Sequence, residues 1–177
     1  LLLLNGIRMN DSQTGHNNMN IPVDLDDVEK IEIIKGPAAR RFGQNAYAGV
    51  INIITKATPG KRVKISADGG DYSTYGLGFN AQIGNEKFTN SLQANSSSSE
   101  GYMFNTDYEI RNVFYQGKLN IKNGDVRVQA GFSEKKFGAN GFYASSAATK
   151  QYEETQASIV SVAHQQTFGK LKLNSNV

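Results

Sequence analysis

The residues best suited to chemistry lie in a polar stretch near the start of the chain, residues 9–20. It offers amide, carboxylate, hydroxyl and imidazole groups that donate or accept hydrogen bonds, namely Asn10, Asp11, Ser12, Gln13, His16, Asn17 and Asn18. One interpretation is a loop that binds a polar ligand, because binding residues concentrate on loops. The other is a solvated loop whose Asn and Asp side chains close turns. His16 has no second His or Cys nearby, so no metal site is predicted.

The rest of the sequence gives no catalytic pattern. The chain has two His and no Cys, which removes thiol chemistry, zinc ribbons and disulfide frameworks. No Ser lies in a G-x-S-x-G turn, and no glycine-rich loop matches a phosphate-binding motif. Glu29 and Glu32 could pass for an acid/base pair, but on a strand their spacing places them on opposite faces. An enzyme is therefore not expected.

Two apolar runs rich in β-branched residues, 28–34 and 50–55, predict buried strands in the first third of the chain. A segment of small residues joins them, and its Gly36-Pro37 pair is a turn signal. Residues 1–8 predict a further buried strand that runs into a turn. A short helical turn is expected after Asp24, a suitable N-cap residue.

Beyond residue 59 the pattern changes to alternation of apolar and polar residues, which is typical of strands with two different faces. Seven such segments are predicted, at about 63–68, 74–83, 88–94, 113–121, 126–133, 156–167 and 171–174. In the second of them, Tyr75, Leu77 and Phe79 share one face, while Asn80 and Gln82 belong to the other.

The connections between these strands alternate in length. Short turns are expected near residues 85, 124 and 169, and long polar loops at 96–111 and 134–150. Short turns on one side and long loops on the other are typical of outer-membrane β-barrels. A soluble β-sandwich is the commoner alternative, but it turns more often. Its buried face would also not hold Gln116, Lys118 and Asn120 together, so the barrel is preferred.

Residues 32–56, which read EIIKGPAARRFGQNAYAGVINIITK, resemble the end of the plug domain of TonB-dependent outer-membrane receptors. The resemblance implies an all-β membrane protein fragment. Residues 1–58 would be the C-terminal part of an α+β plug domain, and residues 59–177 the first antiparallel strands of a transmembrane β-barrel. A plugged barrel of this kind has about 22 strands, of which about seven are predicted here. We therefore expect the chain to be part of a longer protein.

The charge and hydropathy of the chain fit this interpretation. Its 19 basic and 16 acidic residues give a net charge of +3 without a basic stripe, so no nucleic-acid partner is expected. No apolar run approaches the ~20 residues of a membrane helix. A search for long apolar runs does not detect barrel strands, because only every second residue of such a strand faces lipid.

The resemblance also implies a function, a location and partners. The family takes up scarce, bulky nutrients, cobalamin or ferric siderophores, across the outer membrane of Gram-negative bacteria. It is driven by TonB and its inner-membrane motor complex through a segment that would precede Leu1. The ligand can be handed over by a surface lipoprotein, and the barrel contacts the lipid bilayer. LLNGIR together with ISADGGDYSTY resembles the cobalamin receptor branch. The alternatives are a non-transport barrel, such as an adhesin or an enzyme, and a soluble β-sandwich binding module.

The resemblance assigns roles to individual residues. The charged members of the plug motif (residues 32–56) would pair with the inner barrel wall as a lock that retains the plug. The motif positions carried over are Glu32, Lys35, Gly36, Pro37, Arg41, Gly43, Gly49 and Asn52. In the cobalamin branch, early outer loops can carry an Asp cluster that binds calcium. Glu100, Asp107 and Glu109 are too dispersed to predict such a site, so no cofactor is expected.

Overall fold

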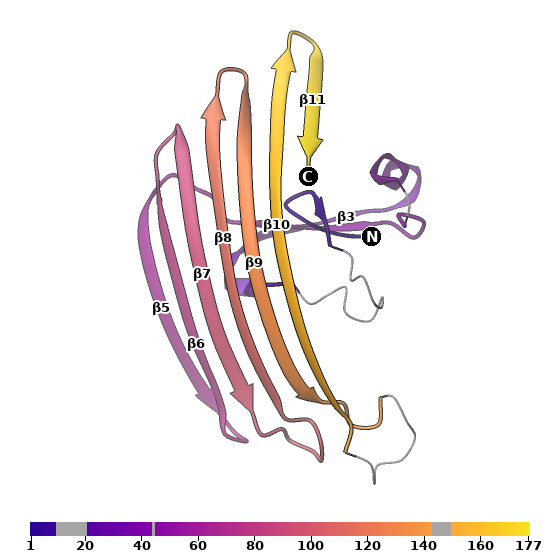
Figure 1. The fold of residues 1–177 in the computed structure, drawn as a ribbon, viewed down its shortest axis with the longest axis vertical. Coiled ribbons are helices and arrows are strands. Elements are labelled where there is room, and N and C mark those ends of the chain that lie inside the picture. The colour runs from indigo at the N-terminus through magenta and orange to yellow at the C-terminus, as the bar shows by residue number, and fades with distance from the viewer. Residues whose placement is uncertain (10–20, 44, 143–149) are drawn as a thin grey trace.

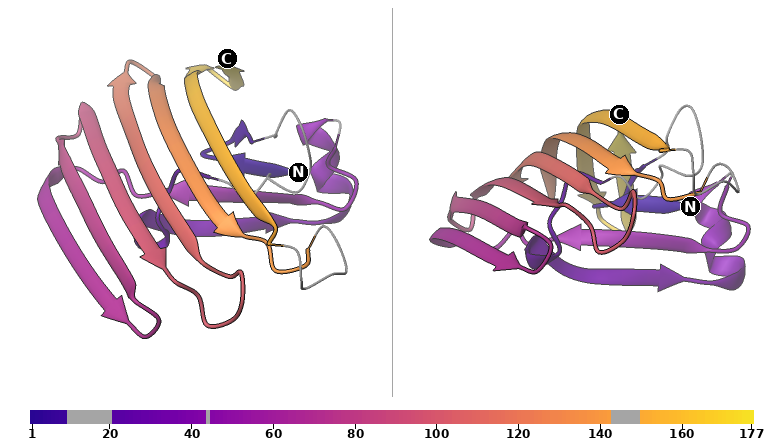
Figure 2. Two further views of the ribbon diagram at one scale, coloured as in Figure 1. Left: turned by 60° about the horizontal axis from the view of Figure 1, so that its bottom comes forward. Right: turned by 90° about the horizontal axis from the view of Figure 1, so that it is seen from below.

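The structure is a computed structural model that describes residues 1–9, 21–43, 45–142 and 150–177, and it contains two β-sheets (Figure 1). The small sheet has four strands in the order β2-β1-β4-β3, and the larger one, here called the wall, has seven in the order β11 to β5. The small sheet lies on the concave side of the curved wall, and its strands cross those of the wall (Figure 2).

The small sheet contains the two predicted strands, β3 (Val28–Ile34) and β4 (Val50–Thr55), as an antiparallel pair. β1 (Leu2–Leu4) runs parallel to β4 and turns back into β2 (Ile7–Arg8). The prediction that β3 is buried is wrong in part, because Ile31 and Ile33 are 52% and 64% exposed. β3 is the edge strand of the described sheet, so nothing described flanks it on one side.

Two short 3-10 helices connect these strands. The predicted helical turn after Asp24 is η2 (Leu25–Asp27). The segment of small residues, expected as a turn, forms η3 (Gly36–Phe42), with Pro37 in its first turn. Pro suits this position because its fixed φ is pre-organised for the helix and its missing N–H would have had no partner there.

Each face of the small sheet has its own apolar cluster. On the face toward the wall, Leu2, Leu4, Val23 and Ile53 pack with Phe114 of the wall. On the face away from the wall, Leu3 and Val50 pack with Ala39 of η3 and with Ala46. The first cluster therefore joins the two sheets, while the second holds η3 on the small sheet.

The wall is a meander of antiparallel neighbours, and all seven predicted strands are confirmed. They are β5 (Gly60–Gly70), β6 (Thr74–Gly84), β7 (Phe88–Ser99), β8 (Tyr108–Ile121), β9 (Gly124–Gly138), β10 (Tyr152–Phe168) and β11 (Leu171–Asn176). The predicted loops were too long, because Ser96 still pairs with Arg111, and Ser99 with Tyr108. Backbone pairing continues there although the side chains no longer alternate between apolar and polar.

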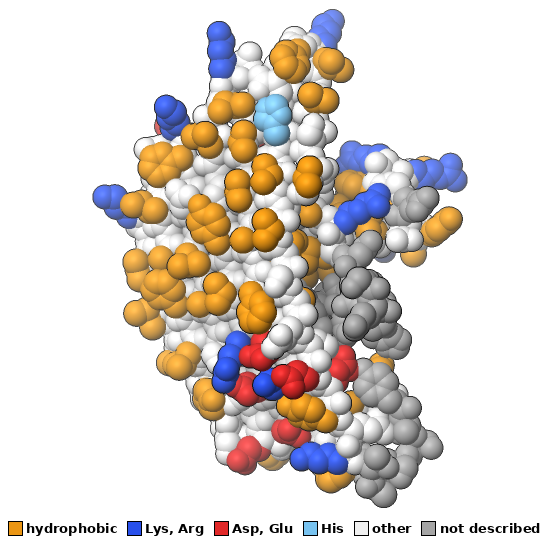
Figure 3. All heavy atoms as spheres, viewed as in Figure 1, with side chains coloured by type: hydrophobic (Ala, Val, Ile, Leu, Met, Phe, Trp, Pro, Cys, Tyr) orange, Lys and Arg blue, Asp and Glu red, His pale blue; other side chains and the backbone are white. Residues whose placement is uncertain are grey.

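The two faces of the wall differ as the alternation predicted. On β6, Tyr75, Leu77 and Phe79 are exposed on the convex face, while Asn80 and Gln82 point inward and are partly covered. Hydrophobic side chains are spread over the middle of the convex face, with acidic and basic groups beyond them at one end (Figure 3). No helix within the described part of the chain is long and apolar enough to cross a membrane.

Candidate functional site at the interface of the small sheet and the wall

The predicted ligand-binding residues Asn10, Asp11, Ser12, Gln13, His16, Asn17 and Asn18 lie outside the described residues, so their role stays a prediction. The described residues on either side of this stretch, Met9 and Ile21, both pack against the cluster around Leu4 and Phe114. Met9 and Ile21 thus both lie where the small sheet meets the wall.

The glycines of the plug motif occupy positions that other residues would fill only with strain. Gly49 has φ 133°, and a Cβ there would lie 2.7 Å from the carbonyl oxygen of Ile34. Gly43 has φ 80° and follows η3, where its N–H donates to the carbonyl of Arg40 at 3.0 Å. Gly36 also has a positive φ, of 71°. These residues, with Pro37, shape the connection between β3 and β4.

The charged residues of the plug motif lie on the face of the small sheet that points away from the wall, or on η3. Glu32 pairs with Lys30 at 2.8 Å and accepts a hydrogen bond from Asn52 Nδ2 at 3.1 Å. The Lys30 hydrogen bond, reinforced by Asn52, holds the pKa of Glu32 below its ordinary value. Arg41 lies 4.8 Å from the ring centroid of Phe42, and Lys35 is exposed before η3. The lock that the resemblance implies for these residues stays a prediction.

Neutral side chains form the central polar contact between the small sheet and the wall. This amide cluster consists of Asn5, Thr55, Gln116 and Gln129. Asn5 accepts a bond from the Thr55 N–H at 3.0 Å and donates to Gln129 Oε1 at 3.1 Å. Thr55 Oγ1 donates to Gln116 Oε1 at 2.5 Å, and Gln116 Nε2 donates to the carbonyl of Lys56, also at 2.5 Å. Asn5 holds a φ of 52°, which Asn tolerates better than most residues.

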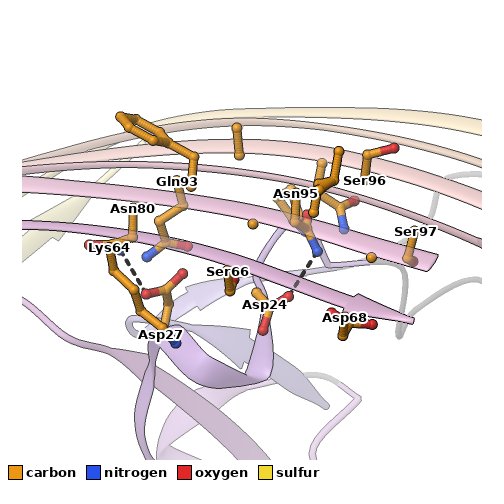
Figure 4. A pocket seen from close by; sticks show the side chains of 17 residues that line it. Asp24, Asp27, Lys64, Ser66, Asp68, Asn80, Gln93, Asn95, Ser96 and Ser97 are labelled. Carbon is orange, nitrogen blue, oxygen red and sulfur yellow. Dashed lines mark hydrogen bonds between the residues drawn. The ribbon is translucent and has the colours of Figure 1, made fainter. Parts of the chain in front are cut away.

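Two aspartates of the small sheet's connecting segment make the second polar contact with the wall. Asn95 Nδ2 of β7 donates to Asp24 Oδ2 at 2.9 Å, and Asn80 Nδ2 of β6 donates to Asp27 Oδ1 at 2.7 Å. Figure 4 shows both bonds, with η2 facing the inner side of the wall. A hydrogen bond to a charged acceptor is stronger than a neutral one, so these bonds anchor η2 to β6 and β7.

A cavity lies on either side of the contact made by Phe114 and the amide cluster. One, of about 340 Å³, is bounded by η2 and by the inner faces of β5 to β8. The other, of about 270 Å³, is bounded by Asn5, Glu29 and the opposite ends of β7 to β10. The amide cluster itself forms part of the lining of the second cavity. Among the described residues, no group of three His, Cys, Asp or Glu is placed to hold a metal ion.

The interface residues were only partly identified by sequence reasoning. The alternation of residues places Asn80, Gln82 and Gln116 on polar strand faces. No local pattern pairs them with Asn5, Asp27 or Gln129, or indicates that Asn95 meets Asp24. A usable signal exists, because the inner faces of β6, β7 and β8 each carry at least two Asn or Gln residues. This signal does not identify which residues of the small sheet the amides contact.

A small sheet packed inside a curved, outwardly apolar wall is the arrangement of a plugged β-barrel. Residues 1–50 match the TonB-dependent Receptor Plug Domain family. The vitamin B12 transporter of Photobacterium profundum is 29% identical over 133 residues, covering 74% of this chain and 21% of that protein. The ferric enterobactin receptor of Pseudomonas aeruginosa is 62% identical over 34 residues, covering 19% of this chain and 5% of that protein.

Solved structures share the fold over nearly the whole chain. The siderophore receptor PiuA of Acinetobacter baumannii matches with a TM-score of 0.74 and 14% identity, covering 99% of this chain and 28% of that one. Residues 1–50 thus match the plug domain of TonB-dependent receptors, and the chain as a whole shares its fold with the solved receptors. It spans about a fifth of the vitamin B12 transporter and about a third or less of the solved receptors. The relatives are transporters and receptors, not enzymes.

Proposed function

We propose that the protein containing this chain takes up a scarce, bulky nutrient across the outer membrane in a TonB-dependent manner. Residues 1–58 would be the C-terminal part of its plug domain, and residues 59–177 the first strands of its barrel. The observation that carries the proposal is the plug-like sheet held on the polar concave side of the wall by the amide cluster and Phe114. Such a sheet blocks a lumen until it is moved.

The exposed apolar residues of the wall support a location in the outer membrane. Leu77, Phe79, Leu92, Val113 and Phe132 are between 39% and 58% exposed on the convex face. A soluble protein rarely exposes so continuous an apolar surface. Strands of 11 to 17 residues in β5 to β10 are long enough for the ~9–11 residues that a tilted strand needs to cross a bilayer.

Orientation can be tested with cysteines introduced singly, because these 177 residues contain none. Met103 lies in the long connection between β7 and β8, and Asn123 in the short turn between β8 and β9. In the full-length receptor, Met103→Cys should react with an impermeant thiol reagent on intact cells, and Asn123→Cys should react only after the cells are opened. The reverse pattern would invert the topology.

For the nutrient, we propose cobalamin first and a ferric siderophore second. The vitamin B12 transporter matches along 133 residues, whereas the ferric enterobactin receptor matches along 34. Energy would come from TonB and its motor complex through a segment outside this chain, and a surface lipoprotein could deliver the ligand. A barrel that serves as an adhesin remains the competing function.

The test is growth of the source bacterium on limiting vitamin B12, and separately on limiting iron, with and without the intact gene. Loss of growth on one nutrient, reproduced by removing TonB, would support uptake and identify the class of ligand. Unchanged growth on both, together with lost attachment to a surface, would favour the adhesin.

A further inference from the structure

The cavity between η2 and the wall has the size and construction of a small-molecule site. Its volume of about 340 Å³ falls in the range of ligand pockets, roughly 300–1,000 Å³. Figure 4 shows Asp24 and Asp27 on one side of it and inner side chains of β5 to β7, such as Lys64, Asn80 and Asn95, on the other.

The charge of this cavity is negative. Among the described residues, three carboxylates line it, those of Asp24, Asp27 and Asp68, together with one ammonium group, that of Lys64. Asp24 accepts a hydrogen bond from Asn95, and Asp27 accepts one from Asn80. A polyanionic solute would meet net repulsion here, while a cation or a neutral donor would not.

Two buried acceptors in the same cavity have no donor among the described residues. Gln93 and Asn112, on the inner faces of β7 and β8, are only 4% and 7% exposed. Gln93 Oε1 and Asn112 Oδ1 accept no hydrogen bond there. A buried acceptor without a donor is costly, so both oxygens favour an occupant that brings N–H or O–H groups.

Two glycines of β6 contribute to the wall of this cavity. Gly76 lies opposite Asp68 of β5, and Gly78 lies opposite Ser66. A Cβ at Gly76 would lie 2.5 Å from Asp68 Oδ1, and one at Gly78 would collide with Ser66 Oγ. A larger residue at either position would displace the Asp68 carboxylate or the Ser66 hydroxyl from its present place at the cavity wall.

We infer that this cavity is a solute subsite for N–H donors, of either the primary carboxamide or the ammonium type, and that it rejects anions of the same shape. The inference rests on the proposed uptake function, because the solute would be the nutrient that the receptor takes up. Such a nutrient would present N–H groups to the wall. The acceptors supply the selectivity. Carboxylates and amide oxygens both accept from N–H, and neither can donate to an anion.

Acetamide and acetate form a matched pair of probes, because they have nearly the same shape and differ in donors and charge. Crystals of the full-length receptor should be soaked with acetamide, methylammonium or acetate at equal concentration. Acetamide or methylammonium should occupy the cavity within hydrogen-bond distance of Gln93 Oε1 or Asn112 Oδ1, and acetate should not. Which of the two donors binds distinguishes the carboxamide from the ammonium type.

In solution, Gln93→Leu should weaken binding of the preferred probe about threefold to tenfold, the usual range for one lost hydrogen bond. Gln165→Leu on β10 makes the same change outside the cavity and should leave binding unchanged. Water alone in the cavity, equal binding of acetate, or no effect of Gln93→Leu would overturn the inference. A bound probe without nutrient uptake would refute the proposed function alone, and uptake with only water in the cavity would refute the inference alone.

Discussion

The two faces of the small sheet carry different kinds of polar group. Toward the wall, Thr55 of β4 is buried in the amide cluster, where its partners are all neutral. On the opposite face, Asn52 of the same strand donates to Glu32, which is paired with Lys30. Burying a charge costs far more than burying an amide that keeps its hydrogen bonds. The central contact with the wall is therefore built from neutral side chains, while Glu32 and Lys30 pair on the opposite face, here called the open face.

The largest effect is expected from Phe114, which is fully buried between the two sheets. Phe114→Ala should cost about 3–5 kcal/mol of contact stability, because it leaves a cavity against Leu4 and Ile53. Hydrogen exchange of β1 and β4 in the full-length receptor should rise steeply. The gel mobility of the folded barrel should not change. Unchanged exchange would show that this cluster does not hold the small sheet.

Arg41 tests whether the open face is held as well. If Arg41 pairs with an acidic group on the inner barrel wall, Arg41→Ala should weaken the attachment of the plug to the barrel. The expected loss of free energy is about 3 kcal/mol. Arg41→Lys should restore only part of this, because lysine lacks the planar fork of donors. Protease nicking of η3 is the measurement. If neither variant changes the rate of nicking, Arg41 has no ion-pair partner on the barrel wall. Its contact with Phe42, worth about 0.5–1 kcal/mol, would then be its only stabilising interaction among those described.

The amide cluster should give an intermediate effect. Gln116→Leu removes the acceptor for Thr55 and the donor to Lys56, at a cost of about 1–3 kcal/mol. Exchange should rise at Thr55 and Lys56 and stay unchanged in η3. The matched control is Gln165→Leu, an amide on the wall that lies outside both cavities. Equal effects of the two substitutions would remove the special role of the cluster.

The smallest effect concerns the pH dependence of the open face. The pKa of Glu32 is lowered in the folded state by the bond from Lys30, so the contribution of Glu32 is present above its unfolded pKa and is lost as the pH falls through its folded pKa. Exchange in β3 should therefore rise below about pH 4.3, and Glu32→Gln should flatten that part of the profile. Both groups are exposed, so high salt should weaken the effect. A Glu32→Gln profile with the native slope would contradict the assignment.

The comparison also explains how much could be predicted from the sequence. β3, β4 and the two faces of β6 were predicted because period and β-branching are local signals. The exposure of Ile31 and the extension of β7 to Ser99 were not, since each depends on what lies beside the strand. The amide cluster joins Asn5 to Gln129 across 124 positions. Single amides on a strand look like ordinary polar residues until the fold brings them together.

The central claim is that the small sheet sits against the inner face of the wall, and a cysteine pair tests it most directly. Asp27 and Asn80 are hydrogen-bonded in the structure, whereas Phe79, the neighbour of Asn80, points to the convex face. In the full-length receptor, Asp27→Cys with Asn80→Cys should be joined by a short thiol crosslinker. Asp27→Cys with Phe79→Cys should not. Crosslinking of the Phe79 pair alone, or of neither pair in a folded barrel, would contradict the account.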